Sequence, residues 1–142
     1  MLKNIPPIIS PDLMKVLMEM GHGDEIVLAD GNFPATSLTD NLVRCDGLEI
    51  PDLLEAVLHF FPIDTYVRHP VQLMAVVQGD SVKPEIWNEY EEIIYRQTKL
   101  KIPFEYMDRF SFYERAKQAF AVVATSEKEQ YANIILKKGV VK

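Results

Sequence analysis

Several short stretches of the sequence combine titratable side chains with residues that bend the backbone. His22 lies between Gly21 and Gly23, directly after an apolar helix pattern and before a buried strand pattern. The glycines permit a sharp turn and leave space for a ligand beside the ring. Imidazole is also the side chain best suited to exchange protons near neutral pH. His22 is therefore a candidate acid/base group, and the alternative is an exposed turn histidine at a helix end.

Asp30 stands at the end of the apolar run 26–29 and begins a loop that contains glycine and proline. Ligands of open α/β sheets collect at the carboxyl ends of strands, so Asp30 is a candidate ligand contact. The alternative is an Asx turn that only starts the loop. His22 and Asp30 flank one strand at opposite ends, about 20 Å apart at ~3.3 Å per residue. A site that uses both needs a loop that folds back, or neighbouring segments or subunits that complete it.

Further polar side chains are spaced so that they share a face of an expected element. Arg109 and Tyr113 are four residues apart and lie together if both are helical. Arginine could bind hydroxyls or a carboxylate, and tyrosine could donate a proton, although an amphipathic surface helix has the same pattern. Tyr131 and Asn133 are two residues apart at the start of an expected strand and so point to one face. Asp64 is one more loop acid, a type that is usually only solvated.

The motifs of metal and nucleotide sites are missing. His22, His59 and His69 have none of the spacings typical of zinc ligands, and Cys45 has no cysteine partner. The sequence contains no glycine-rich dinucleotide or phosphate-binding loop and no serine nucleophile motif. We therefore expect no metal and no cofactor, and Cys45 is interpreted as a small buried residue at a strand end.

Composition narrows the class of protein. The chain has 142 residues, of which 48% are hydrophobic and 25% charged, as in ordinary globular domains. Its net charge of −6 argues against a nucleic-acid partner, since binding phosphates requires an excess of Lys and Arg. No apolar run approaches the roughly 20 residues of a membrane span. The N-terminus lacks the apolar core of a signal peptide, and one cysteine forms no internal disulfide, so we expect a cytoplasmic protein without membrane contact.

The elements that must position these residues follow from hydrophobic spacing and turn residues. Ser10 and Pro11 form a helix start, with a hydroxyl N-cap and a proline in the first turn. The patterns predict helices at 11–20, 51–61, 84–98 and 110–119, and strands at 25–30, 42–46, 71–77, 104–107, 120–125 and 131–136. This alternation predicts one α/β domain over residues 1–142, with helices around a largely parallel sheet. The connection between the last two strands is too short for a helical crossover, which favours an antiparallel pair or a mixed sheet.

Six segments carry a resemblance to a known family. They are 20–25 (MGHGDE), 28–30 with 32–35 (LAD, NFPA), 44–48 (RCDGL), 64–66 (DTY), 109–116 (RFSFYERA) and 131–136 (YANIIL). In this order they resemble the family of L-fucose mutarotases and ribose pyranases, from one end of the chain to the other. Segment 109–116 is of the fucose type, whereas Ala132 is the residue found in pyranases where fucose mutarotases more often have glycine.

The resemblance implies roles for the candidate residues. His22 matches the family's proton-donating histidine, and Tyr113 is a second acid/base candidate. The sugar-binding positions are matched by Asp30, Arg109, Tyr131 and Asn133, with Asp64 as a further contact. Members of the family assemble as homo-oligomeric rings, often decamers of two pentamers, with sites near subunit contacts. Such an assembly would explain a site that uses both His22 and Asp30.

The resemblance also implies an activity. It is the interconversion of the α and β anomers of fucose-like pyranoses by acid/base-assisted ring opening, which requires no metal or nucleotide. The alternatives are a ribose pyranase, a non-catalytic sugar-binding subunit and a structural oligomerising domain. The segment around Arg109 and Tyr113 favours a mutarotase over a pyranase. His22 argues against binding alone, because a neutral sugar can be held without a titrating group.

Overall fold

The first helix begins where the sequence marks a helix start. In the computed structural model, which describes all 142 residues, helix α1 spans Pro11–Glu19. The Ser10 side chain accepts a hydrogen bond from the Leu13 amide at 3.1 Å, which satisfies one of the free N–H groups of the first turn. Leu13, Val16 and Leu17 form its buried face. Helix α1 ends before Met20, so that the histidine-containing turn follows at once.

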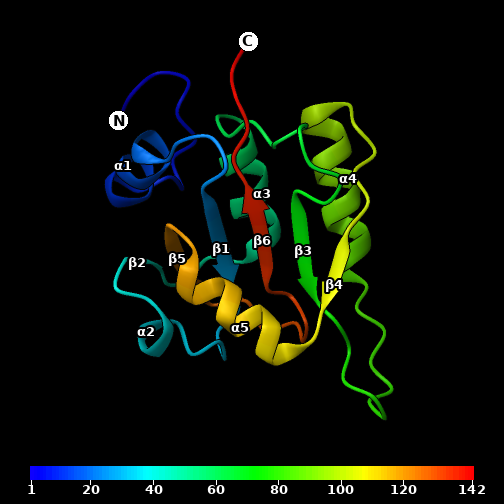
Figure 1. The fold of residues 1–142 in the computed structure, drawn as a ribbon. Helices are drawn as coiled ribbons and strands as arrows, with labels where there is room; N and C mark the ends of the chain where they lie inside the picture. Colours follow the sequence, from blue (N-terminus) through cyan, green and yellow to red (C-terminus); the bar gives the residue numbers. More distant parts are fainter.

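Six strands form one mixed sheet in the order β2-β5-β1-β6-β3-β4 (Figure 1). Strand β1 pairs in parallel with β5 and antiparallel with β6, and it is buried from Ile26 to Ala29. A strand that is buried on both faces has a continuous run of apolar residues, as β1 has. The strand bounds are β1 (Glu25–Ala29), β2 (Leu42–Cys45), β3 (Val71–Met74), β4 (Glu105–Met107), β5 (Ala121–Thr125) and β6 (Ile134–Lys137).

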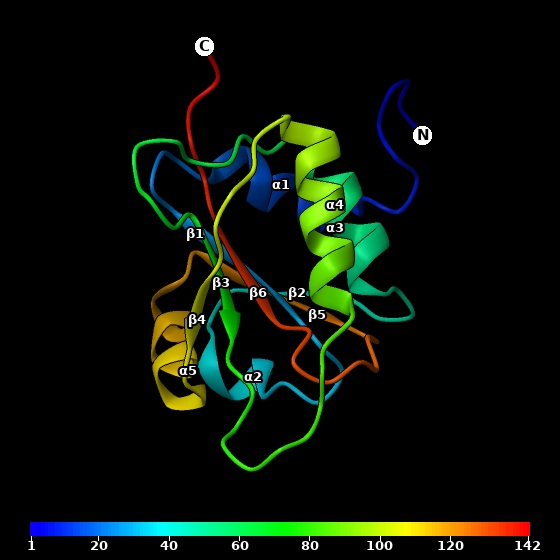
Figure 2. The same ribbon diagram turned by 90° about the vertical axis from the view of Figure 1, so that its right-hand side faces the viewer.

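Helices cover both faces of the sheet and make three layers (Figure 2). The remaining helices are α2 (Ala35–Leu38), α3 (Ile50–Leu58), α4 (Ile86–Thr98) and α5 (Arg109–Gln118). Helices α1, α3 and α4 pack on one face through the larger core cluster, which includes the buried side chains of Leu13, Leu54 and Ile94. Helices α2 and α5 pack on the other face, where Phe112 and Ala35 lie in a smaller cluster. On this face α5 contacts both α2 and β3.

The α/β fold in one domain and the mixed sheet are confirmed, with differences at particular elements. Strands β5 and β6 run in opposite directions but are not neighbours, because β1 lies between them. Strand β3 ends at Met74 rather than at residue 77, and the short helix α2 was not predicted. Strand β6 begins at Ile134 rather than at Tyr131, because Tyr131 has a φ of 59° and leaves the extended conformation.

Candidate functional site

A polar cavity of about 310 Å³ opens where β1 ends, between α5 and the segment that leads into β6. Its volume is at the lower end of the range of small-molecule sites, ~300–1,000 Å³. Five predicted site residues line it: Asp30, Arg109, Tyr113, Tyr131 and Asn133. The other lining residues are Asn32, Phe33, Met74, Val77 and Gln130. Segments that are far apart in the sequence thus meet at one end of the sheet.

Asp30 and Asn133 are bonded to each other at the end of β1. The Asp30 amide donates to Asn133 Oδ1 at 2.7 Å, and the Asn32 amide donates to Asp30 Oδ1 at 2.9 Å. Burial raises the pKa of Asp30, and the charge of Glu127 acts in the same direction, while amide hydrogen bonds from Asn32, Phe33 and Asn133 oppose the shift. The carboxyl group is therefore fixed in direction and partly withdrawn from water.

Helix α5 places Arg109 and Tyr113 on the face that borders the cavity. Its N-cap Asp108 accepts a hydrogen bond from the Ser111 amide at 3.0 Å, which starts the helix at Arg109. At its other end Arg115 forms two hydrogen bonds with Glu25 of β1, at 2.7 and 2.8 Å. This forked ion pair fixes the helix against the central strand. The predicted i, i+4 pairing is confirmed.

Tyr131 is held in an unusual backbone conformation. Its left-handed φ of 59° is uncommon for a residue other than glycine and needs support from its surroundings. Helix α4 supplies that support, since Trp87 Nε1 donates to the Tyr131 carbonyl at 2.8 Å and the Tyr90 hydroxyl to the Ala132 carbonyl at 2.6 Å. The two carbonyl groups bond to α4 instead of a neighbouring strand, which explains why β6 begins later than predicted.

His22 and Asp64 lie together at the opposite end of β1. His22 Nε2 is 3.2 Å from Asp64 Oδ1, and the His22 side chain is 46% exposed whereas that of Asp64 is 3% exposed. Tyr66 packs beside the imidazole, with 5.3 Å between ring centroids. Burial acts to raise the pKa of Asp64, but the Tyr66 amide, the His22 ring and the Lys137 charge outweigh it and hold that pKa below its usual range.

The C-terminal segment brings His22 and Asp64 together. The amide of Gly23, whose φ is +88°, donates to the Lys138 carbonyl at 2.8 Å, and the amide of Asp64 donates to the Lys137 carbonyl at 3.0 Å. Gly139 crosses so close to Asp64 that an added Cβ would lie 2.8 Å from the Asp64 Cα. A side chain at Gly139 would therefore push the two loops apart.

The structure thus divides the seven predicted residues into two groups. Five line the cavity, and His22 and Asp64 lie beyond the other end of β1, a strand of five residues. That length corresponds to about 16 Å at ~3.3 Å per residue. The expected separation of His22 and Asp30 within one chain is confirmed. The roles of all seven residues stay predictions, and the contacts of Asp64 are with His22 rather than with the cavity.

Glu127 is a buried acid near the cavity that sequence reasoning missed. Its carboxylate accepts hydrogen bonds from the amides of Ile50, Lys128 and Glu129, at 2.9–3.0 Å. It thereby caps the N-terminus of α3 and shapes the loop before Tyr131. A run of charged residues between two strands, as here, ordinarily indicates a solvated loop, so no local signal marks Glu127 as buried.

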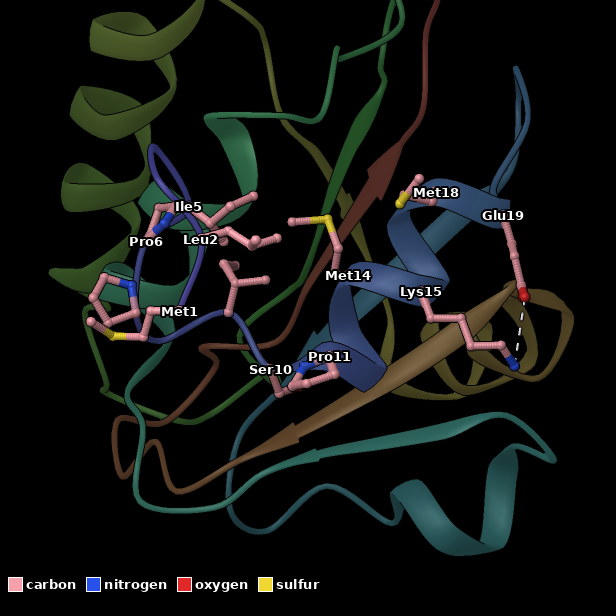
Figure 3. Close-up of a pocket in the computed structure, with 12 residues that line it drawn as sticks. Met1, Leu2, Ile5, Pro6, Ser10, Pro11, Met14, Lys15, Met18 and Glu19 are labelled. Carbon is pink, nitrogen blue, oxygen red and sulfur yellow. Dashed lines mark ion pairs between the residues drawn. The ribbon is translucent and has the colours of Figure 1, made fainter.

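A larger cavity lies elsewhere in the molecule. It has a volume of about 850 Å³ and lies between the N-terminal segment and α1 (Figure 3). Methionine, isoleucine and proline side chains dominate its lining, and the ion pair of Lys15 and Glu19 lies at its border. It lacks the converging polar groups of the smaller cavity, which remains the candidate site.

No helix has the length and hydrophobicity that crossing a bilayer demands, and no three His, Cys, Asp or Glu side chains converge to hold a metal ion.

Known proteins resemble the chain over its whole length. Residues 3–141 match the RbsD / FucU transport protein family. An L-fucose mutarotase of Histophilus somni is 51% identical over 140 residues, which cover 99% of this chain and 97% of that protein. A fucose mutarotase of Streptococcus pneumoniae, solved in complex with L-fucose, is 54% identical with a TM-score of 0.95, covering 99% of this chain and all of the other.

Two further structures extend the comparison. FucU of Bifidobacterium longum is 49% identical with a TM-score of 0.95, over 99% of this chain and 100% of its own. RbsD of Bacillus subtilis, solved with D-ribose, is 24% identical with a TM-score of 0.74 over the full length of both chains, which supports a shared fold. From the matched residues and the full-length relatives, we conclude that this chain belongs to the RbsD / FucU transport protein family.

Proposed function

We propose that the protein is an isomerase that interconverts the α and β anomers of L-fucose. The observation that carries the proposal is the polar cavity lined by Asp30, Arg109, Tyr113, Tyr131 and Asn133 in a chain 51% identical to an L-fucose mutarotase. A structure 54% identical to this chain holds L-fucose. The cavity has the size and the hydroxyl-binding side chains that a single monosaccharide requires.

Anomer exchange needs two proton transfers and no other change. A proton goes to the ring oxygen and another leaves the anomeric hydroxyl, so that the bond between C1 and the ring oxygen breaks and an aldehyde forms. Rotation about the C1–C2 bond presents the other carbonyl face, and reversing both transfers closes the ring on it. Only protons move between the sugar and the protein, so the sugar and acid/base side chains suffice for the reaction.

His22 gives the proton to the ring oxygen, and Tyr113 exchanges the proton of the anomeric hydroxyl. The Asp30 carboxylate accepts hydrogen bonds from sugar hydroxyls, the side-chain N–H groups of Asn133 donate to them, and Arg109 presents its forked N–H donors. Asp64 acts through His22, because its bond to Nε2 at 3.2 Å orients the ring. Such a positioned acid/base group is worth about 10²–10⁴ in rate.

The catalytic site combines two copies of the chain. Within one chain, His22 is exposed at one end of β1 and the cavity opens at the other, so one proton donor cannot serve its own cavity. A ring in which each copy inserts its His22 turn at the neighbour's cavity resolves this geometry. A homo-oligomer, with a decamer as the expected form, and a cytoplasmic location belong to the same proposal.

Exchange NMR on the anomeric protons tests the activity. We expect catalytic amounts of protein to transfer saturation between α- and β-L-fucopyranose far faster than buffer alone. The same measurement on D-galactose and D-ribose defines the sugar, because a site built for one set of hydroxyls leaves polar groups unpaired with another sugar. L-fucose exchange no faster than in buffer would refute the proposal.

Two alternatives to a fucose mutarotase are a ribose pyranase and a non-catalytic sugar-binding subunit. A ribose pyranase would accelerate exchange between the pyranose and furanose signals of ribose and leave L-fucose unaffected. A sugar-binding subunit would broaden the sugar signals without transferring saturation. Each alternative therefore has its own pattern in one experiment.

A further inference from the structure

The hydroxyl of Tyr131 is engaged on two sides by the loop that follows β3. It donates to Asp80 Oδ2 at 2.6 Å, and the Val77 amide donates to it at 3.3 Å. The same loop forms a turn in which the Asp80 amide donates to the Val77 carbonyl at 3.0 Å, with Gly79 at a φ of +90°. Both groups that hold the hydroxyl therefore belong to one turn.

The hydrogen bonds of this turn determine the direction of the Tyr131 proton. The bond from Tyr131 and the amide of Val82 hold the pKa of Asp80 below its usual range, so its carboxylate is ionised and can only accept. A tyrosine has one O–H, and that proton is used in the short bond to Asp80. The Val77 amide uses one lone pair of the phenolic oxygen, so one lone pair is left to accept a further hydrogen bond, and Tyr131 lines the cavity.

We propose that Asp80 is a positioning residue that fixes the Tyr131 hydroxyl as a hydrogen-bond acceptor for one sugar hydroxyl. The inference rests on the proposed function, since it deepens the account of the sugar site. It assigns Asp80, which lies outside the cavity lining, an effect on the sugar exerted through Tyr131. It also excludes Tyr131 as a proton donor toward the sugar.

The backbone of Tyr131 is fixed independently of Asp80. Trp87 binds the Tyr131 carbonyl and Tyr90 binds the next carbonyl, both from helix α4. The loss of the Asp80 carboxylate would therefore leave the main chain of Tyr131 in place and release the proton of its hydroxyl. This separation makes the effect of Asp80 on the sugar measurable without unfolding the segment.

A simpler role for Asp80 is to stabilise its own turn, because Asp80 Oδ1 accepts from the Val82 amide at 3.0 Å. Asp80→Asn distinguishes the two roles. The asparagine side chain keeps an oxygen for the Val82 amide, but it replaces the charged acceptor of the Tyr131 proton by a neutral amide of the same shape. Asp40→Asn is the matched control, since Asp40 is exposed and precedes β2 at the end of the sheet away from the cavity.

The test is a double-mutant cycle of Asp80→Asn and Tyr131→Phe, read as L-fucose affinity and as KM and kcat of anomer exchange. We expect each single variant to weaken affinity about fivefold with a smaller effect on kcat, as for one lost hydrogen bond to a neutral group. The double variant should be no weaker than Tyr131→Phe, because Asp80 acts through the missing oxygen. Losses that multiply in the double variant would overturn the inference, as would equal losses in Asp40→Asn.

A spectroscopic measurement separates this inference from the activity. With ¹³C at the tyrosine ζ carbon, the Tyr131 signal is assigned by its disappearance in Tyr131→Phe. We expect it to move in Asp80→Asn and to stay unchanged in Asp40→Asn, with or without sugar. An unmoved signal would refute the role of Asp80 whatever the activity. A moved signal in a protein that binds L-fucose without exchanging its anomers would refute the mutarotase proposal and support the role of Asp80.

Discussion

At the scale of single residues, hydrogen bonding decides which nitrogen of His22 is free. The lowered pKa of Asp64 means that its carboxylate is ionised and must accept, so the proton of the shared bond belongs to His22 Nε2. Nδ1 is then the nitrogen without a proton in the neutral ring. A buried acid thus holds the neutral imidazole in one tautomer.

Removing the imidazole should stop proton delivery and leave the fold intact. We expect His22→Ala to lower the rate of anomer exchange by about 10²–10⁴, the usual contribution of one acid/base group. The side chain is half exposed in a glycine-flanked turn, so little packing is lost. Exchange NMR at saturating L-fucose measures the rate, and sedimentation confirms that the assembly is unchanged. Arg109→Ala is the comparison, because it should mainly weaken affinity. A near-normal rate in His22→Ala would shift the proton-donor role to Tyr113.

The pair of His22 and Asp64 also predicts how stability depends on pH. Because the native pKa of Asp64 lies below its unfolded value of about 3.9, its carboxylate stabilises the fold above that pH. This contribution is lost as the pH falls through the native pKa. We expect urea unfolding to show a steeper acid loss of stability for the wild type than for Asp64→Asn.

Asp40→Asn is the control for that comparison, because its exposed carboxylate makes no hydrogen bond or ion pair. It should follow the wild-type curve throughout. Parallel curves for the wild type and Asp64→Asn would show that the bonds around Asp64 do not stabilise its charge.

At the scale of elements, helix α4 fixes the segment that enters β6. The hydroxyl of fully buried Tyr90 bonds the carbonyl of fully buried Ala132, where no water can replace it. We expect Tyr90→Phe to lower the free energy of unfolding by about 1–3 kcal/mol, since a buried carbonyl loses its partner. Chemical denaturation measures the loss. Tyr95→Phe on the exposed face of α4 is the control and should have little effect. Equal stability of both variants would contradict the role given to α4.

The elements themselves were largely predictable from the sequence, and their differences have local causes. Periodicity locates α1 and β1 within one residue, because α1 has an apolar face and β1 is a continuous apolar run, and the spacing of Phe112 and Ala116 locates α5. The predicted start of β6 was wrong because residues 131–133 were joined to the apolar run that follows them, whereas bonds from α4 hold Tyr131 in a left-handed conformation. Those bonds join segments more than 40 residues apart, and no local pattern contains them.

The site residues could be predicted where they follow a strand or lie on a helix that the sequence pattern identifies. Asp30 follows a strand, and Arg109 and Tyr113 share a helix face, so pattern and resemblance together found them. Asp80 and Glu127 were missed, since each acts through hydrogen bonds to a distant segment. Such residues are identified only from the hydrogen bonds of the folded structure.

At the scale of the whole molecule, the separation of His22 from the cavity predicts an assembly. We expect sedimentation velocity to show a homo-oligomer larger than a dimer, because a ring lets every cavity receive a histidine from a neighbour. Dilution to protein concentrations at which the oligomer dissociates should lower anomer exchange in proportion to the fraction dissociated. A fully active monomer of 16.3 kDa would contradict this account.

Complementation between two inactive variants tests the shared site most directly. One chain carries His22→Ala with an intact cavity, and the other carries Asp30→Asn and Arg109→Ala with an intact His22. When they are co-expressed and assemble at random, about one quarter of the sites combine an intact cavity with a neighbour's His22. We expect the mixed oligomer, assayed at L-fucose well below KM, to recover about a quarter of the wild-type kcat/KM. Activity no higher than that of the separately purified variants would contradict a site built from two copies.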